Sequence, residues 1–83
     1  MPTGVRMLAF AGARDVVGAA EVELPLASPC TAAELLQEMC ARYPGLEAYR
    51  TSIRLAVNGT YAAPHDPVRA GDEVALIPPV AGG

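Results

Sequence analysis

Residues 31–43 read TAAELLQEMCARY, which is the one long helical pattern in the 83-residue chain. Thr31 and Glu34 have the spacing of a capping box, in which each side chain accepts a hydrogen bond from the backbone amide of the other residue. Pro44-Gly45 then ends the pattern. The stretch predicts a helix that begins at Thr31 and packs one apolar face on a core; that face consists of Leu35, Leu36, Met39, Cys40 and Tyr43.

Strand-like runs stand on both sides of this helix. Residues 5–10 predict a first strand, and residues 20–24 alternate charged and apolar positions, as a strand with one solvated face does. Pro25 is expected to close that strand. After the helix, Asn58-Gly59 separates two strand-like runs and is the strongest short hairpin signal, because both turn residues need a positive φ. Residues 73–77 predict the last strand.

The connections carry weaker patterns. One or two helical turns are expected at residues 13–17, one loose turn at 46–50, and an irregular connection around Pro64 and Pro67. The element order is therefore strand, strand, helix, hairpin, strand. Its simplest packing is α+β, a mixed twisted sheet with one main helix across one face, which is the β-grasp (ubiquitin-like) fold. We expect residues 1–77 to form this domain and residues 78–83 to form an extended tail.

Composition excludes several classes of function. The chain is 52% apolar with a formal net charge of −3, which argues against nucleic acid and anionic membranes as partners. Its six basic residues are all arginine. Arg6 interrupts the early apolar run, so no signal peptide is expected, and no stretch reaches the ~20 apolar residues of a membrane span.

The two cysteines are expected to be free thiols. Cys30 and Cys40 are too few for a secreted disulfide scaffold, and ten helical positions separate them by ~15 Å, beyond the ~7 Å a disulfide allows. We therefore expect a reducing, cytoplasmic location. Cys40 is expected to be core, whereas Cys30 precedes the helix start, where a thiolate would be favoured. The single histidine, His65, has no cluster of partners, so no metal site is expected.

Strand alternation predicts a docking surface. If Val5, Met7, Val74 and Leu76 face the helix, the other face of the sheet has no cover, and it presents Leu8, Phe10, Ala75 and Ile77. Tyr61, on the hairpin, is a candidate to join them. An exposed apolar patch on a small protein usually marks a partner surface. These five residues are therefore our candidate partner interface.

The last six residues suggest the chemistry. Pro78 and Pro79 hold φ near −65° and project the chain in an extended form. Val80 and Ala81 are small, and Gly82 and Gly83 have no side chains, so the tail can enter a narrow slot in another protein; these tail-insertion residues precede the working group, which is the Gly83 carboxylate. Adenylation by ATP followed by attack of a sulfur nucleophile would convert that carboxylate into a thiocarboxylate. The chain has no phosphate-binding loop, so we expect a partner enzyme to use the ATP and this chain to bind no cofactor.

The sequence resembles the small subunit of molybdopterin synthase, one of the ubiquitin-like sulfur carriers. The Phe-Ala-x-x-Arg run after the first strand favours this family over the thiamine-pathway carrier. The resemblance covers nearly the whole chain and is carried by residues 10–14 with Gly18, by residues 43–46, by residues 56–59 and, most specifically, by residues 71–83.

The resemblance implies a reaction scheme. An adenylyltransferase related to ubiquitin-activating enzymes adenylates Gly83, and a sulfurtransferase converts it to a thiocarboxylate (1-thioglycine). The carrier then docks on the large subunit of molybdopterin synthase, with contacts at positions matching Phe10, Tyr61 and Ile77. It inserts its tail and gives sulfur to cyclic pyranopterin monophosphate during molybdenum cofactor biosynthesis. The implied assembly is a heterotetramer in which this chain is catalytic only as a subunit.

Other functions stay open from the residues themselves. The same carrier chemistry serves thiamine thiazole or cysteine synthesis in other pathways. A protein modifier would join Gly83 to lysines of target proteins, and this chain offers no lysine for chains of its own. A passive binding domain with a frayed tail is the fourth possibility.

Overall fold

A computed structural model describes residues 3–78 of the chain. The predicted tail residues Pro79, Val80, Ala81, Gly82 and Gly83 lie outside the described residues, as do residues 1–2. The described elements, in chain order, are β1 (Gly4–Ala9), α1 (Ala11–Val17), β2 (Glu21–Pro25), β3 (Cys30–Thr31), α2 (Ala32–Arg42), a 3-10 helix η1 (Pro44–Tyr49), β4 (Arg54–Val57), β5 (Thr60–Tyr61), β6 (Pro67–Val68) and β7 (Glu73–Ile77).

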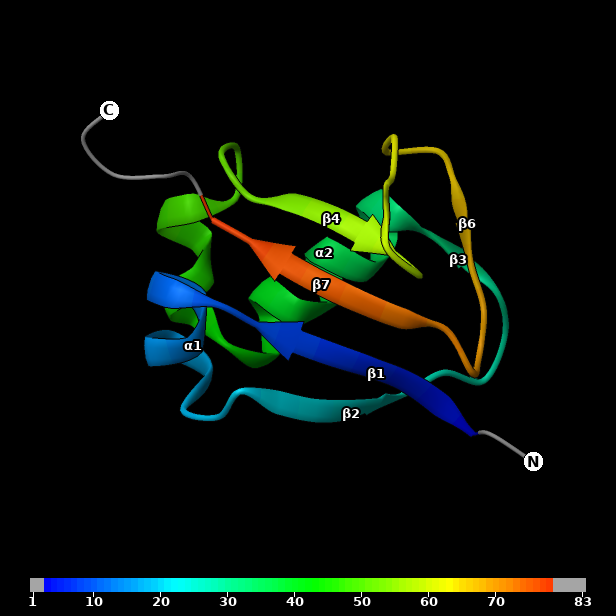
Figure 1. Cartoon of the computed structure of the whole chain (residues 1–83), viewed down its shortest axis with the longest axis horizontal. Helices are drawn as coiled ribbons and strands as arrows, with labels where there is room; N and C mark the ends of the chain where they lie inside the picture. The colour runs from blue at the N-terminus through cyan, green and yellow to red at the C-terminus, as the bar shows by residue number, and fades with distance from the viewer. Residues whose placement is uncertain (1–2, 79–83) are drawn as a thin grey trace.

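Five of these strands form one mixed sheet in the order β2-β1-β7-β4-β5. The two central strands, β1 and β7, run parallel, and the other neighbours in this sheet are antiparallel. Helix α2 lies behind the sheet in Figure 1 and covers one face of it. The arrangement is the α+β, ubiquitin-like fold predicted from the element order.

The core lies between this sheet and α2. Val5 and Met7 of β1 and Val74 and Leu76 of β7 are at most 1% exposed, as strand alternation predicts for the face that meets a helix. Leu35 and Met39 project into the same cluster from α2, and Cys40 is buried there as predicted.

Helix α2 begins as its sequence predicts. The Thr31 hydroxyl accepts a hydrogen bond from the Glu34 amide at 3.2 Å, and a Glu34 carboxylate oxygen accepts one from the Thr31 amide at 2.8 Å. This capping box satisfies two amides that a helix start leaves without partners. The helix ends at Arg42, with Tyr43 at its C-cap before Pro44.

The hairpin turn is also confirmed. Asn58 has φ of 51° and Gly59 has φ of 86°, the positive values that a two-residue turn requires. The Asn58 side chain reaches β7, because its Oδ1 accepts a hydrogen bond from the Glu73 amide at 2.9 Å and its Nδ2 donates to Asp72 Oδ1 at 3.1 Å. The hairpin is thereby tied to the start of the last strand.

Three details differ from the sequence prediction. Residues 64–68 are not wholly irregular, because β6 pairs with β3 in a separate two-stranded sheet and buries Val68. Pro25 is the last residue of β2 and pairs opposite Gly4 instead of closing the strand from outside, which an edge strand tolerates. The turns expected at 13–17 and 46–50 are longer, since α1 begins at Ala11 and η1 begins at Pro44.

Candidate functional site

The face of the sheet opposite α2 carries a continuous apolar strip. Leu8 is the register partner of Ala75, Ala75 pairs with Ala56, and Ala56 pairs with Tyr61, so these side chains point to the same side. Ile77 lies two residues beyond Ala75 in β7. Phe10 lies two residues beyond Leu8, just after the end of β1, where it is the extended N-cap residue of α1, so both share that side. We call Leu8, Phe10, Tyr61, Ala75 and Ile77 the apolar strip.

Exposure sets the strip apart from the rest of the surface. Phe10 is 49% exposed and Tyr61 is 61% exposed, and within residues 3–78 they are the only large hydrophobic residues classed as exposed. Leu8, Ala75 and Ile77 are half-buried between them. The face predicted from alternation is thus confirmed as the uncovered one, and the role of these five residues as a partner interface stays a prediction.

Two shallow hollows adjoin the strip. One, of about 280 Å³, is bounded by Leu8, Phe10 and Arg14 and reaches Glu21. The other, of about 410 Å³, lies beside Tyr61 and Arg54 and continues toward the N-terminal turn of α2. Each end of the strip thus borders a hollow.

The root of the tail lies in the strip itself. Ile77 is a strip residue and the last residue of β7, and Pro78 after it is buried. The sequence analysis assigned Pro78 to the extended tail. In the structure Pro78 is buried, so it packs against the domain. The chain beyond residue 78 therefore starts from a fixed point beside the exposed apolar side chains.

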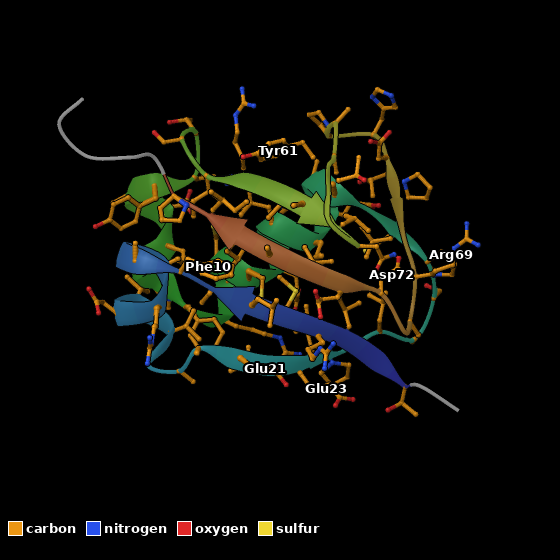
Figure 2. All side chains as sticks on the ribbon, in the orientation of Figure 1. Phe10, Glu21, Glu23, Tyr61, Arg69 and Asp72 are labelled. Atoms are coloured by element: carbon orange, nitrogen blue, oxygen red, sulfur yellow. The ribbon has the colours of Figure 1, made fainter. Side chains whose placement is uncertain are left out.

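Charged side chains flank the part of the strip that lies on β1 and β7. Glu21 and Glu23 of β2 are exposed and are the register partners of Leu8 and Arg6. On the other side, Arg54 of β4 is the register partner of Ile77, and its guanidinium carbon lies 5.6 Å from the centre of the Tyr61 ring. Figure 2 shows Glu21 and Glu23 along β2 and Tyr61 on the other side of the β1–β7 pair.

Sequence reasoning did not assign these three charged residues to the site. The alternation of residues 20–24 places Glu21 and Glu23 on a solvated face, and the same alternation from Leu55 places Arg54 there. That signal was present in the sequence. The sequence does not give the strand register, which determines which charged side chains become neighbours.

The thiols do not join this site. Both cysteines are free, as predicted, and Cys40 is buried. The expectation that a thiolate is favoured at Cys30 is wrong, because burial raises the pKa of this thiol and the nearby Glu34 carboxylate raises it further. Cys30 is therefore a protonated thiol at neutral pH.

Other chemistry is not visible in the described part of the chain. Within residues 3–78 no three His, Cys, Asp or Glu side chains gather as ligands for a metal ion. His65 is exposed, and its Nε2 lies 3.8 Å from Asp66 Oδ1. None of the described helices combines the length and the hydropathy that a transmembrane span needs. What these residues present is an exposed apolar strip next to the root of the tail.

Comparisons with known proteins agree with this description. The model of the ThiS family matches residues 7–83. A molybdopterin synthase sulfur carrier subunit from Arabidopsis thaliana is 35% identical over 79 residues, which cover 95% of this chain and 82% of that protein.

Solved structures share the fold. A putative molybdopterin converting factor, subunit 1, from Pyrococcus furiosus superposes with a TM-score of 0.82 at 27% identity, covering 94% of this chain and 99% of that one. The small archaeal modifier protein 1 of Haloferax volcanii superposes with a TM-score of 0.81 at 29% identity, with coverages of 94% and 99%. The chain belongs to the ThiS family, and it is similar over nearly its whole length to sulfur carrier subunits of molybdopterin synthase.

Proposed function

We propose that this chain is the sulfur carrier subunit of a molybdopterin synthase and that its reactive group is the carboxylate of Gly83. A partner adenylyltransferase activates this carboxylate with ATP, and a sulfurtransferase converts it to a thiocarboxylate. The charged carrier then docks on the large synthase subunit and gives its sulfur to cyclic pyranopterin monophosphate. Because the chemistry uses ATP and thiols, we place it in the cytoplasm.

One observation carries the proposal: Ile77 is at once part of the apolar strip and the last residue of β7. A protein that covers the strip is therefore already at the root of segment 79–83. This arrangement raises the effective concentration of the chain end at a site on the same partner. A surface without such a tail, or a tail far from any docking surface, would not have this effect.

The comparisons support the same function. The ThiS family match continues through Gly83, so it includes the Pro-Pro-Val-Ala-Gly-Gly run on which the chemistry depends. Curated relatives from a plant and from Homo sapiens, at 35% and 33% identity, carry the name molybdopterin synthase sulfur carrier subunit.

The activation has two balanced steps. A carboxylate oxygen of Gly83 attacks the α-phosphate of ATP, an oxygen–phosphorus bond forms, and pyrophosphate leaves. Hydrosulfide released by the sulfurtransferase then attacks the glycyl carbon and loses its proton to water, and AMP leaves with one of the two original carboxylate oxygens. The thiocarboxylate keeps the negative charge of the terminus and adds a strongly nucleophilic sulfur.

Transfer takes place on the partner. The strip covers the large subunit's docking surface while the slim tail enters its active site, where the thiocarboxylate sulfur attacks a carbon of the pyranopterin and displaces an oxygen substituent. Water then hydrolyses the resulting thioester, which leaves the sulfur on the product and releases the Gly83 carboxylate. Two transfers, each from a separate charged carrier, supply the two sulfurs of the dithiolene. The heterotetramer fits this requirement because it places a carrier at each end of a large-subunit dimer.

The test is reconstitution with purified proteins. The chain is charged by its adenylyltransferase and a sulfur source, and intact mass is measured for the replacement of one oxygen by sulfur. It is then mixed with the large subunit and cyclic pyranopterin monophosphate, and molybdopterin is assayed. A charged chain that forms no molybdopterin but supports thiazole or cysteine synthesis would move the assignment to another pathway.

A second function has one supporting observation. The similarity to the small archaeal modifier protein 1 favours a role as a protein modifier in which Gly83 forms an amide with a lysine of another protein. Expression of a tagged chain in its own cells distinguishes the two. A ladder of covalent adducts that requires Gly83 would support the modifier role.

A further inference from the structure

Three charged side chains on the open face of the sheet have no ion-pair partner within residues 3–78. They are Glu21, Glu23 and Arg54; Arg14 of α1, which borders the hollow that reaches Glu21, likewise forms no ion pair among these residues. The charged residues between them are paired, because Arg6 on β1 forms an ion pair with Glu73 on β7 on the same face. The sheet thus neutralises this pair internally and leaves the charges on β2 and β4 free.

The free charges have opposite signs on two strands that lie on opposite sides of the β1–β7 pair. β2, with both glutamates, and β4, with Arg54, are separated by β1 and β7 in the sheet. Three strand spacings amount to ~14 Å between these two strands. The face therefore has glutamates on the edge strand β2, which we call the acidic margin, and apolar side chains on β1 and β7. Arg54 on β4 lies between β7 and the strand of Tyr61, and we call it the basic margin.

The basic margin is ordered without being neutralised. The Arg54 guanidinium lies against the Tyr61 ring, 5.6 Å from its centre, and a cation–π contact of this kind holds the group in place. A guanidinium that lies over a ring still has N–H donors at its edges, and these can donate hydrogen bonds to a carboxylate. Arg54 is thus presented as a receptor for an acidic side chain.

A partner that covers the strip must place groups of opposite charge against these residues. Burying a charged group without a counter-charge is costly, and like charges set against each other are repelled. We propose that the protein docked on the apolar strip carries basic side chains opposite Glu21 and Glu23 and a carboxylate opposite Arg54. The polarity admits one orientation of the two proteins; it rests on the proposed function, in which the docked protein is the large synthase subunit.

Charge reversal tests this inference. The double variant Glu21→Arg/Glu23→Arg and the single variant Arg54→Glu are compared with the wild-type chain for binding to the purified large subunit. Association rates are measured by biolayer interferometry at low and at physiological salt. Each variant is expected to associate about tenfold more slowly at low salt, and the difference should shrink as salt screens the charges.

Matched controls separate local from global charge. Glu38→Arg and Arg42→Glu change the net charge by the same amount per residue, but they lie on α2, which covers the other face of the sheet. They should leave the association rate within about twofold of wild type. Because a reversal can disturb folding, Glu21→Gln/Glu23→Gln and Arg54→Gln are measured as well, and they should show a smaller loss in the same direction.

The outcomes are distinguishable. If the reversed variants associate like wild type while Phe10→Asp abolishes binding, the strip docks without regard to polarity, so this inference fails and the proposed function survives. If neither Phe10→Asp nor the reversals change binding, both the inference and the docking step of the proposed function fail. If the chain alone sediments as a dimer that the reversals dissociate, the occupant is a second copy and the inference is overturned.

Discussion

Replacing Asn58 by alanine perturbs the hairpin that presents Tyr61 to the apolar strip. Asn58 has φ of 51°, a conformation that alanine adopts with strain, and its amide connects the turn to β7. Its Oδ1 accepts a hydrogen bond from the Glu73 amide at 2.9 Å, and its Nδ2 donates one to Asp72 at 3.1 Å. Alanine loses both bonds and keeps the unfavourable φ.

The expected loss of stability follows from these contacts. Each hydrogen bond contributes about 1 kcal/mol, and less where solvent competes for the exposed groups. The left-handed conformation costs alanine about 1 kcal/mol. The sum is about 2–3 kcal/mol in the free energy of unfolding, which corresponds to a fall in Tm of roughly 10–20 °C for a domain of this size.

Urea unfolding, followed by circular dichroism, measures this loss of stability. The slope of the free energy of unfolding against urea concentration (the m-value) should stay unchanged. Asn58→Gly is the matched control, because glycine lacks the same hydrogen bonds but accepts a positive φ. It should be more stable than Asn58→Ala by about 1 kcal/mol. The reasoning is refuted if Asn58→Ala lies within about 0.5 kcal/mol of wild type, or if the glycine and alanine variants unfold at the same urea concentration.

The remaining predictions concern the chain end, a thiol and a close backbone contact. An alanine added after Gly83 should abolish charging, seen as the absence of the thiocarboxylate by intact mass, while binding to the large subunit persists; undiminished charging would contradict the proposed chemistry. Burial and the Glu34 charge raise the pKa of Cys30, so its alkylation by iodoacetamide should be slower than that of free cysteine at about pH 8. Glu34→Gln keeps the capping box and should speed the reaction; an unchanged rate would exclude the carboxylate as a cause. Because its pKa is raised, the Cys30 thiol binds its proton more tightly in the folded state than in the unfolded state. The free energy of unfolding should therefore stay constant below pH 9.0, the ordinary thiol pKa, and fall as pH rises above it. Urea unfolding across that pH range measures this change. Gly4→Ala should destabilise the β1–β2 pair strongly in thermal unfolding, because its Cβ would lie 2.4 Å from the carbonyl oxygen of Leu24; a wild-type Tm would contradict that geometry.

Local signals made most of the fold predictable. The capping box at Thr31 and Glu34 and the turn at Asn58-Gly59 each act within a few residues, so their sequence patterns could be interpreted directly. Alternation in β1 and β7 then separated the core face from the open face. These features predict the apolar strip, and the burial of Val5 and Leu76 confirms the face assignment.

Long-range pairing set the limit of prediction. Strands β3 and β6 have two residues each, too few for a periodic pattern, and they form only because the chain brings Cys30 beside Val68. The ion pair between Arg6 and Glu73 joins residues 67 positions apart, so the free charges at the margins could not be identified without the register. The reversed expectation for Cys30 has a similar origin, because burial depends on tertiary packing.

The position of β7 explains why docking and delivery can act together. This strand lies in the middle of the sheet, is paired on both sides by β1 and β4, and buries Val74 and Leu76 completely against the core. Central strands of this kind open only with the highest free energies in a domain. The strip and the root of the tail therefore cannot move apart without unfolding the sheet. Any partner that fixes the orientation of the strip therefore also fixes the position of Ile77 and Pro78, after which the segment that ends in Gly83 begins.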